Sequence, residues 1–156
     1  MKAKVSVFVV ALSVVAMSGL TCPDDCASTD PNLAVDRIDA TLVSQQSPTM
    51  GTVRIEGVVE NKGGSTFDSG PDQQSVQLYD GSTLLAQEDF EDLAVGATVT
   101  VTYTVEWNTS SEFPPTYTVL VALDPDIFID GNPNNDDCPT SDNVLQRSGS
   151  DINDLF

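Results

Sequence analysis

The residues with the clearest capacity for chemistry lie in the stretch from 122 to 138, ALDPDIFIDGNPNNDDC. Asp130, Asn132, Asn134 and Asp136 alternate there at every second position, and two further aspartates precede them. Hard cations such as Ca²⁺ take six to eight oxygen ligands, which aspartates and asparagines in a flexible loop can supply. The spacing therefore predicts a candidate calcium site at these four residues.

The same stretch also suits a purely structural role, which we favour. Asp-Pro, Asp-Gly and Asn-Pro are turn-forming pairs, and Asx side chains hydrogen-bond to loop backbone by themselves. The EF-hand pattern is not matched: counted from Asp130, the sixth position is Asn135 rather than glycine and the twelfth is Ser141 rather than glutamate. Calcium binding stays open as the alternative.

The sequence contains few of the residues and motifs on which enzyme catalysis depends. The chain has no histidine, which excludes Ser-His-Asp and Cys-His nucleophilic schemes. It contains neither a Walker loop nor a dinucleotide-binding fingerprint. Paired carboxylates could serve a glycosidase, but such enzymes need a deep cleft that one small domain rarely provides. We therefore expect a protein that is not an enzyme and that has no cofactor other than the candidate calcium.

The first 18 residues have the pattern of a secretory signal peptide. Lys2 and Lys4 precede an apolar run over 5–17, which is short for a membrane span, and small residues around Ser18 suit cleavage. Export to the cell surface or the medium follows, with the periplasm as a further option. Loss of both lysines would change the net charge from −18 to −20.

Three cysteines in an exported chain suggest one disulfide and one odd thiol. We favour Cys26–Cys138 over a local Cys22–Cys26 bridge. Cys22 follows the apolar run where a bacterial lipoprotein carries its acylated cysteine, so a lipid there would explain the odd count. The preceding residues, Gly-Leu-Thr, match a lipobox poorly. Zinc is disfavoured because three thiolates without histidine do not complete a tetrahedral site.

The charge balance excludes some classes of binding partner. With 24 acidic and 6 basic residues, the surface repels nucleic acid and anionic lipid headgroups. It suits cations, cationic partners or a saline medium, and a solvated acidic surface is the common explanation of such a balance. We expect a protein or glycan partner at a cell surface, no nucleic acid and no membrane span.

The elements that must position these residues are strands. After a polar linker over 19–30, apolar residues alternate with polar ones in several short runs, including 33–42, 53–60, 99–107, 117–123 and 143–147. A phase slip after Val35 predicts a β-bulge. A hairpin is predicted over 75–87, with its turn at Asp80-Gly81. Seven or so strands predict an all-β fold, an antiparallel immunoglobulin/fibronectin-III-like sandwich over 31–147.

Two further features of the sequence leave alternatives open. Trp107 is expected in the core, and an exposed carbohydrate-stacking platform is the other option. The polar tail 148–156 carries Ile152, Leu155 and Phe156, and it is either a frayed terminus or a segment that engages a neighbouring subunit.

Five motifs in order resemble the CARDB domain, a cell-adhesion-related, immunoglobulin-like module of bacteria and archaea. They are PNLAVDRI, VRIEGVVENKGGS, VQLYDG, LAVGATVTVTYTV and YTVLVALDPDIFID with asparagines behind it. The residues that match the family pattern are Asn61, Gly63, Leu93, Gly96, Asp124, Pro125, Asn134 and Asn135. The chain departs from the pattern at Asp130-Gly131 and in the segment DDCPTSDN, so the register of the last strand is open.

The resemblance implies an extracellular module that binds, spaces or displays, without catalytic residues to carry over. The main hypothesis is therefore an exported, non-enzymatic interaction module in adhesion or surface assembly. The alternative is a calcium-dependent carbohydrate-binding module that uses the 130–136 loop and Trp107.

Overall fold

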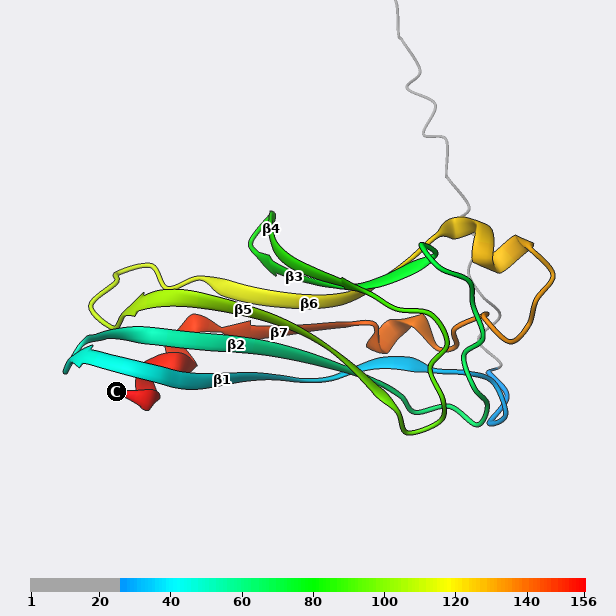
Figure 1. Ribbon diagram of the computed structural model, residues 1–156, viewed down its shortest axis with the longest axis horizontal. Helices are drawn as coiled ribbons and strands as arrows, with labels where there is room; N and C mark the ends of the chain where they lie inside the picture. The colour runs from blue at the N-terminus through cyan, green and yellow to red at the C-terminus, as the bar shows by residue number, and fades with distance from the viewer. Residues whose placement is uncertain (1–25) are drawn as a thin grey trace, which may run out of the picture.

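The computed structural model describes residues 26–156 and shows an elongated β-sandwich (Figure 1). The alternating runs form seven strands, and no α-helix occurs in the described part. The strands are β1 (Leu33–Ser47), β2 (Met50–Asn61), β3 (Gln74–Asp80), β4 (Thr83–Asp89), β5 (Thr98–Asn108), β6 (Thr116–Leu123) and β7 (Val144–Ser148). The predicted all-β sandwich is confirmed.

The strands form two antiparallel sheets. The first has the order β1-β2-β5, and the second has the order β4-β3-β6-β7. The predicted hairpin is β3–β4, where Gly81 in the turn has a φ of 55°, a value that glycine adopts without strain. The last strand pairs with β6 through Val119 opposite Leu145, so the register that the sequence left open is now defined.

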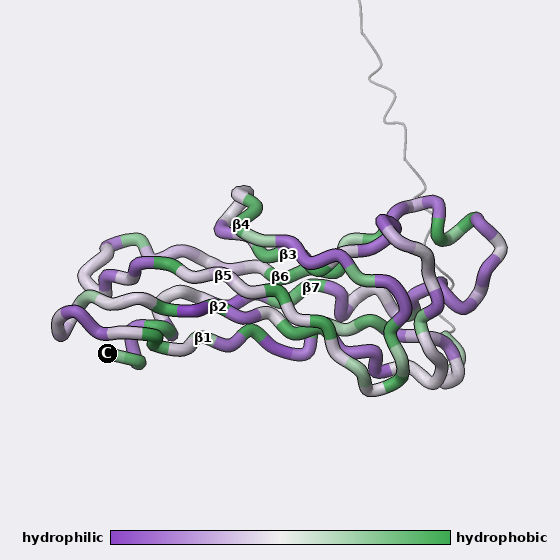
Figure 2. The backbone as a smooth tube through the Cα atoms, viewed as in Figure 1, coloured by the Kyte–Doolittle hydropathy of each residue, from purple (hydrophilic) through white to green (hydrophobic). Residues whose placement is uncertain are grey.

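The core fills the space between the sheets, because each strand turns every second residue inward. Figure 2 shows this alternation of hydrophobic and hydrophilic residues along the strands. The inward residues of β5 include Val101 and Trp107, which are 2% and 5% exposed, while Thr102 and Thr104 face solvent. The largest fully buried side chains are Tyr117, Phe67, Leu33, Ile55, Leu78, Ile127 and Ile152.

Strand β1 is an edge strand with three irregularities. Its pairing with β2 shifts register after Val35, after Leu42 and after Gln45. The first shift is the bulge that the phase slip predicts. The second leaves Val43 unpaired and 58% exposed. Bulges twist an edge away from regular pairing, so they protect this long strand from adding a foreign strand.

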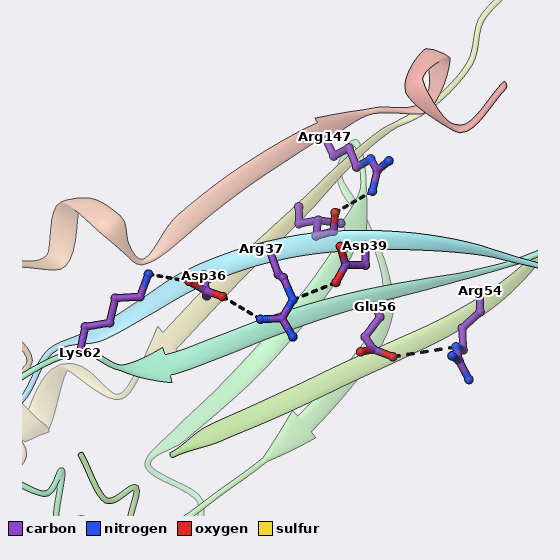
Figure 3. Close-up of polar contacts among 8 residues, drawn as sticks. Asp36, Arg37, Asp39, Arg54, Glu56, Lys62 and Arg147 are labelled. Carbon is purple, nitrogen blue, oxygen red and sulfur yellow. Dashed lines mark hydrogen bonds and ion pairs between the residues drawn. The ribbon is translucent and has the colours of Figure 1, made fainter. Parts of the chain in front are cut away.

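The two sheets meet at the edges formed by β1 and β7. Arg147 on β7 donates from Nη1 to the Ile38 carbonyl oxygen on β1, over 2.7 Å (Figure 3). Exposed ion pairs lie on the neighbouring surface, where Asp36 contacts both Lys62 and Arg37 at 2.7 Å. The buried core and the Arg147 contact hold the sheets together more than these surface pairs do.

Three 3₁₀ helices complete the chain: η1 (Pro125–Ile129), η2 (Thr140–Asp142) and η3 (Gly149–Leu155). The C-terminal helix η3 is not a frayed end, because Ile152 is fully buried and Leu155 packs against the core. The ring of Phe156 lies against Gly51, where a Cβ would come within 2.8 Å of it. The apolar tail residues thus contact their own domain. None of the helices in residues 26–156 is long and apolar enough to cross a membrane.

Candidate functional site

The predicted calcium loop lies at the end of the sandwich where the chain enters the domain, beside η1 and the loop before β3 (Figure 1). Asp130 accepts a hydrogen bond from the Asn132 amide through Oδ1 at 2.6 Å, and from Asn135 Nδ2 through Oδ2 at 2.8 Å. Asn132 in turn accepts from the Asn134 amide at 3.1 Å. These are Asx turns, which the structural interpretation predicts.

Two hydrogen bonds also hold the 130–136 loop against another part of the chain. Asn132 Nδ2 donates to the Asp68 carbonyl oxygen at 3.0 Å, and the Asp68 amide donates to the Asn134 carbonyl oxygen at 2.9 Å. The alternating residues thus hold the 130–136 loop against the segment that leads into β3. Within residues 26–156, no group of three or more acidic or thiol side chains is arranged to hold a metal ion.

Asp136 stands apart from these turns. Burial raises the pKa of its carboxyl group, and the charges of Asp130 and Asp30 raise it further. Its Oδ1 atom and that of the neighbouring Asn135 have no hydrogen-bond partner among the described residues. They are two buried oxygens of this loop that its turns leave without a hydrogen-bond partner.

Asp137 is a buried carboxylate that the sequence analysis did not single out. Its Oδ1 accepts from the Leu33 amide at 2.6 Å, and its Oδ2 accepts from Asn143 Nδ2 at 2.6 Å. Burial raises the pKa of Asp137 to about 6, although both hydrogen bonds oppose that shift. The side chain joins the first residue of β1 to the segment before β7, next to Cys138.

The motif residues of the family resemblance prove to be structural. Asn61 is fully buried, and its Nδ2 donates to the carbonyl oxygens of Ser65 and Leu93 at 2.9 and 2.8 Å. Its Oδ1 accepts from the Gly63 amide at 3.0 Å. A Cβ on Gly63 would collide with the backbone of the entering chain, which explains a glycine there.

The second and third motifs meet in space. The Asn61 amide donates to the Ala97 carbonyl oxygen, and the Gly96 amide donates to the Asn61 carbonyl oxygen. Gly96 has a φ of 73°, which favours glycine. In the last motif, Asp124 caps η1 by accepting from the Asp126 amide at 3.0 Å. These hydrogen bonds order the loops in which the motif residues lie.

Trp107 is 5% exposed and cannot offer a stacking face to a sugar ring. It packs against Tyr117, with the ring centroids 6.4 Å apart, and its Nε1 donates to Asn153 Oδ1 at 2.9 Å. The expected core position is the one found. The carbohydrate platform at Trp107 is therefore wrong, because η3 covers the indole ring.

The cysteine pair favoured from the sequence is present. Cys26 and Cys138 form a disulfide with their Cα atoms 5.6 Å apart. The signal peptide and Cys22, with its candidate lipid, lie outside the described residues.

Comparisons with known proteins give matches among solved structures alone. No family model and no curated protein matches the chain. A crystal structure of a CARDB domain from Pyrococcus furiosus, described as a complex with di-metal ions, has a TM-score of 0.49 and 18% identity over 80% of this chain and 90% of that one. A solution structure of the same archaeal domain has a TM-score of 0.46 and 16% identity, over 76% and 93% of the two chains.

A third solved structure is a domain of a Methanosarcina acetivorans protein, provisionally described as a cell surface protein. Its TM-score is 0.45 and its identity is 17%, over 77% of this chain and 90% of that one. The solved structures to which this chain is similar thus include two structures of one CARDB domain, the family whose motif order its sequence resembles.

Proposed function

We propose that this protein is an exported, non-enzymatic interaction module that acts at a cell surface, in adhesion or in surface assembly. The Cys26–Cys138 disulfide carries the proposal, because structural disulfides persist in oxidising compartments outside the cytoplasm. The signal-peptide pattern over 1–18 and the ordered motifs of an extracellular family point the same way.

The loop chemistry supports binding rather than catalysis. Asparagines and aspartates of the motifs and of the 130–136 loop hydrogen-bond to the backbone and hold the loops in place. Asn61 and Asp130 are examples. An ordered framework of this kind presents its loop tips and sheet faces to a partner, which is how many sandwich domains act.

The experiment is fractionation of bacteria that express the full chain with a C-terminal epitope tag. We expect the tagged chain outside the cytoplasm, shortened by a mass that corresponds to the signal peptide, and with Cys26 disulfide-bonded to Cys138. A variant with Val9→Asp and Val14→Asp in the apolar run is the control that should stay inside. A wild-type chain that remains cytoplasmic, uncleaved and reduced would refute the proposal.

The same fractionation tests a lipid anchor at Cys22. If Cys22 is acylated, the wild-type chain is found with the membranes, and Cys22→Ser releases it. Equal partition of the two chains would exclude the anchor while leaving export intact.

Calcium binding by the 130–136 loop is a second candidate, favoured by the unpartnered Oδ1 atoms of Asn135 and Asp136. Calcium at about 100 times its dissociation constant would stabilise the fold by about 2.7 kcal/mol and raise the melting temperature. Asp136→Asn should remove that increase, and Asp126→Asn should keep it. Identical melting in calcium and in EDTA would exclude this candidate.

A further inference from the structure

Strand β5 forms an open edge of the three-stranded sheet. Among residues 26–156, β2 pairs with one side of it and no strand pairs with the other, while β3 and β4 pack on β5 from the facing sheet (Figure 1). All 11 residues of β5 pair with β2 in one unbroken register, from Thr98 opposite Glu60 to Asn108 opposite Met50. A long, regular edge of this kind can add a further strand.

The other three edges of the sandwich are irregular or short. β1 has three register shifts, β4 has 7 residues with a register shift in its pairing with β3, and β7 has 5 residues. Bulges and short edge strands discourage the addition of a foreign strand. β5 has no bulge, no proline and no lysine, so it is the edge of this fold that lacks such protection.

Two hydrogen bonds at the ends of β5 show which of its backbone groups point away from β2. The Asn61 amide donates to the Ala97 carbonyl oxygen at 3.1 Å, and the Thr109 amide donates to the Thr49 carbonyl oxygen at 2.9 Å. Backbone groups alternate in direction along an antiparallel strand, so the odd-numbered residues of β5 bond to β2.

The even-numbered residues of β5 therefore direct their N–H and C=O groups out of the sheet. These residues are Thr98, Thr100, Thr102, Thr104 and Glu106. In the described part of the chain, their backbone groups form no hydrogen bond with any segment outside the sheet. They form a row of donors and acceptors that a strand of another molecule can pair with.

The edge also lacks the charge that keeps copies of this protein apart. Glu106 is the only charged residue within 93–111, although the chain has 24 acidic residues. Its carboxylate accepts hydrogen bonds from Gln46 Nε2 and Thr52 Oγ1, each at 2.9 Å, on its own sheet. Two chains of net charge −18 repel each other, and this repulsion is weakest where β5 meets β5.

The sequence of β5 is compatible with antiparallel pairing to a second β5. With a two-fold axis at Thr102, the facing pairs are Thr102 with Thr102, Thr100 with Thr104, and Thr98 with Glu106. Threonine pairs across strands stabilise a sheet, and like charges do not face each other in this register. The inward side chains Val99, Tyr103 and Val105 are only partly buried, and an added strand would cover their open side.

We propose that two copies of this protein associate through β5, edge to edge and antiparallel, so that their three-stranded sheets join into one sheet of six strands. The contact is isologous, because each copy contributes the same strand. The proposal is independent of export and adds a specific partner, a second copy of the chain.

The test is sedimentation equilibrium of the purified protein, with the Cys26–Cys138 disulfide formed and with Cys22→Ser to prevent a disulfide between copies. Contacts of this small size give weak complexes, so we expect a dimer with a dissociation constant of about 10 μM. Association should strengthen as NaCl rises from about 0.1 to about 1 M, because the Debye length falls from about 10 to about 3 Å.

Thr102→Pro removes one outward N–H group without removing a hydrogen bond to β2, which is the position that proline tolerates in an edge strand. We expect this variant to melt as a folded protein and to remain monomeric. Thr41→Pro is not a suitable control, so the matched control is Thr41→Asp, an exposed substitution on the outer face of the same sheet but on β1. It should change the dissociation constant by less than about twofold.

A charge pair at residue 102 tests the register without relying on proline. Thr102→Asp and Thr102→Lys each place like charges opposite each other across the two-fold axis, and each should weaken the dimer about fivefold at the lower salt concentration. An equal mixture of the two variants should restore association, because the aspartate of one copy then faces the lysine of the other.

Three results would overturn the proposal. They are a wild-type protein that stays monomeric at about 100 times the expected dissociation constant, a folded Thr102→Pro variant that dimerises like the wild type, and a mixture of the Asp and Lys variants that associates no better than either alone. The last result would place the contact at another surface. Each result leaves the export test unaffected, so the two proposals can fail separately.

Discussion

At the scale of single residues, Asp137 is the group that most directly couples this fold to pH. It is fully buried and holds the Leu33 amide and the Asn143 side chain. Its pKa is raised from 3.8 to about 6, so the folded state holds this proton more tightly than the unfolded state does. The stability from this proton is therefore complete below pH 4 and is lost as the pH rises through 6.

We predict that Asp137→Asn removes this pH dependence. In the wild-type protein, the free energy of unfolding should fall by up to about 3 kcal/mol between pH 4 and pH 7 because of Asp137. The substituted amide can still accept from Leu33, and Asn143 can turn its unpartnered Oδ1 toward it. Urea unfolding at several pH values measures the effect.

Asp151→Asn is the control for that experiment. Asp151 is exposed on η3, so its substitution should leave the slope of the wild-type protein almost unchanged. A slope that persists in Asp137→Asn would show that the general acidity of the surface, rather than this carboxylate, governs the pH response.

The sequence predicted some residue roles and missed others. Cys26, Cys138 and Trp107 were placed correctly, because thiols of a chain predicted to be exported tend to pair and a large aromatic side chain on an alternating strand tends to face the core. Asp137 was not, because its role depends on Leu33, which is 104 residues away in the chain. One aspartate in an acidic run carries no local sign that the fold will bury it.

At the scale of elements, the strands were predictable and the C-terminal helix was not. The period-two pattern gave β5 and β6 and even the bulge after Val35, since alternation directly reports which face is buried. The segment GSDINDL forms η3 without any periodic signal, because a 3₁₀ helix of 7 residues is too short to show one. Its position depends on contacts with distant residues, namely the hydrogen bond from Trp107 to Asn153 and the packing of Phe156 against Gly51.

We predict that Ile152→Ala lowers the free energy of unfolding by about 3 kcal/mol, because it leaves a cavity in a fully buried position. The fluorescence of Trp107 should shift to longer wavelength if η3 loosens and water reaches the indole ring. Chemical denaturation monitored by this fluorescence gives both quantities.

Asp154→Ala is the matched control, since Asp154 lies on the same helix and is exposed. It should change stability by less than about 0.5 kcal/mol. If Ile152→Ala were as mild as Asp154→Ala, η3 would be only loosely attached to the domain.

At the scale of the whole molecule, a disulfide and a strongly one-sided charge act against each other. The net charge of −18 produces self-repulsion that opposes the compact state. The Cys26–Cys138 bond spans 112 residues and restricts the unfolded chain, which stabilises the fold.

We predict that the double substitution Cys26→Ser and Cys138→Ser lowers the free energy of unfolding by about 4–5 kcal/mol, the chain-entropy value for a loop of this length. Thermal melting with and without a reductant measures it, and the reductant should have no effect on the double variant. A loss below about 1 kcal/mol would mean that the disulfide does little to restrict the unfolded chain.

The position of this bond also determines how the protein responds to mechanical load. In Figure 1 the described chain enters at one end of the sandwich and finishes at the other, so tension between them pulls along the strands. With the disulfide closed, force passes directly from residue 26 to residue 138, and only the 18 residues beyond it can be drawn out, about 60 Å. With the disulfide open, the 130 residues beyond residue 26 could be drawn out to a total length of about 440 Å. Under shear, a module of this kind would therefore lengthen very little while the disulfide is oxidised. It would lengthen much further once the disulfide is reduced.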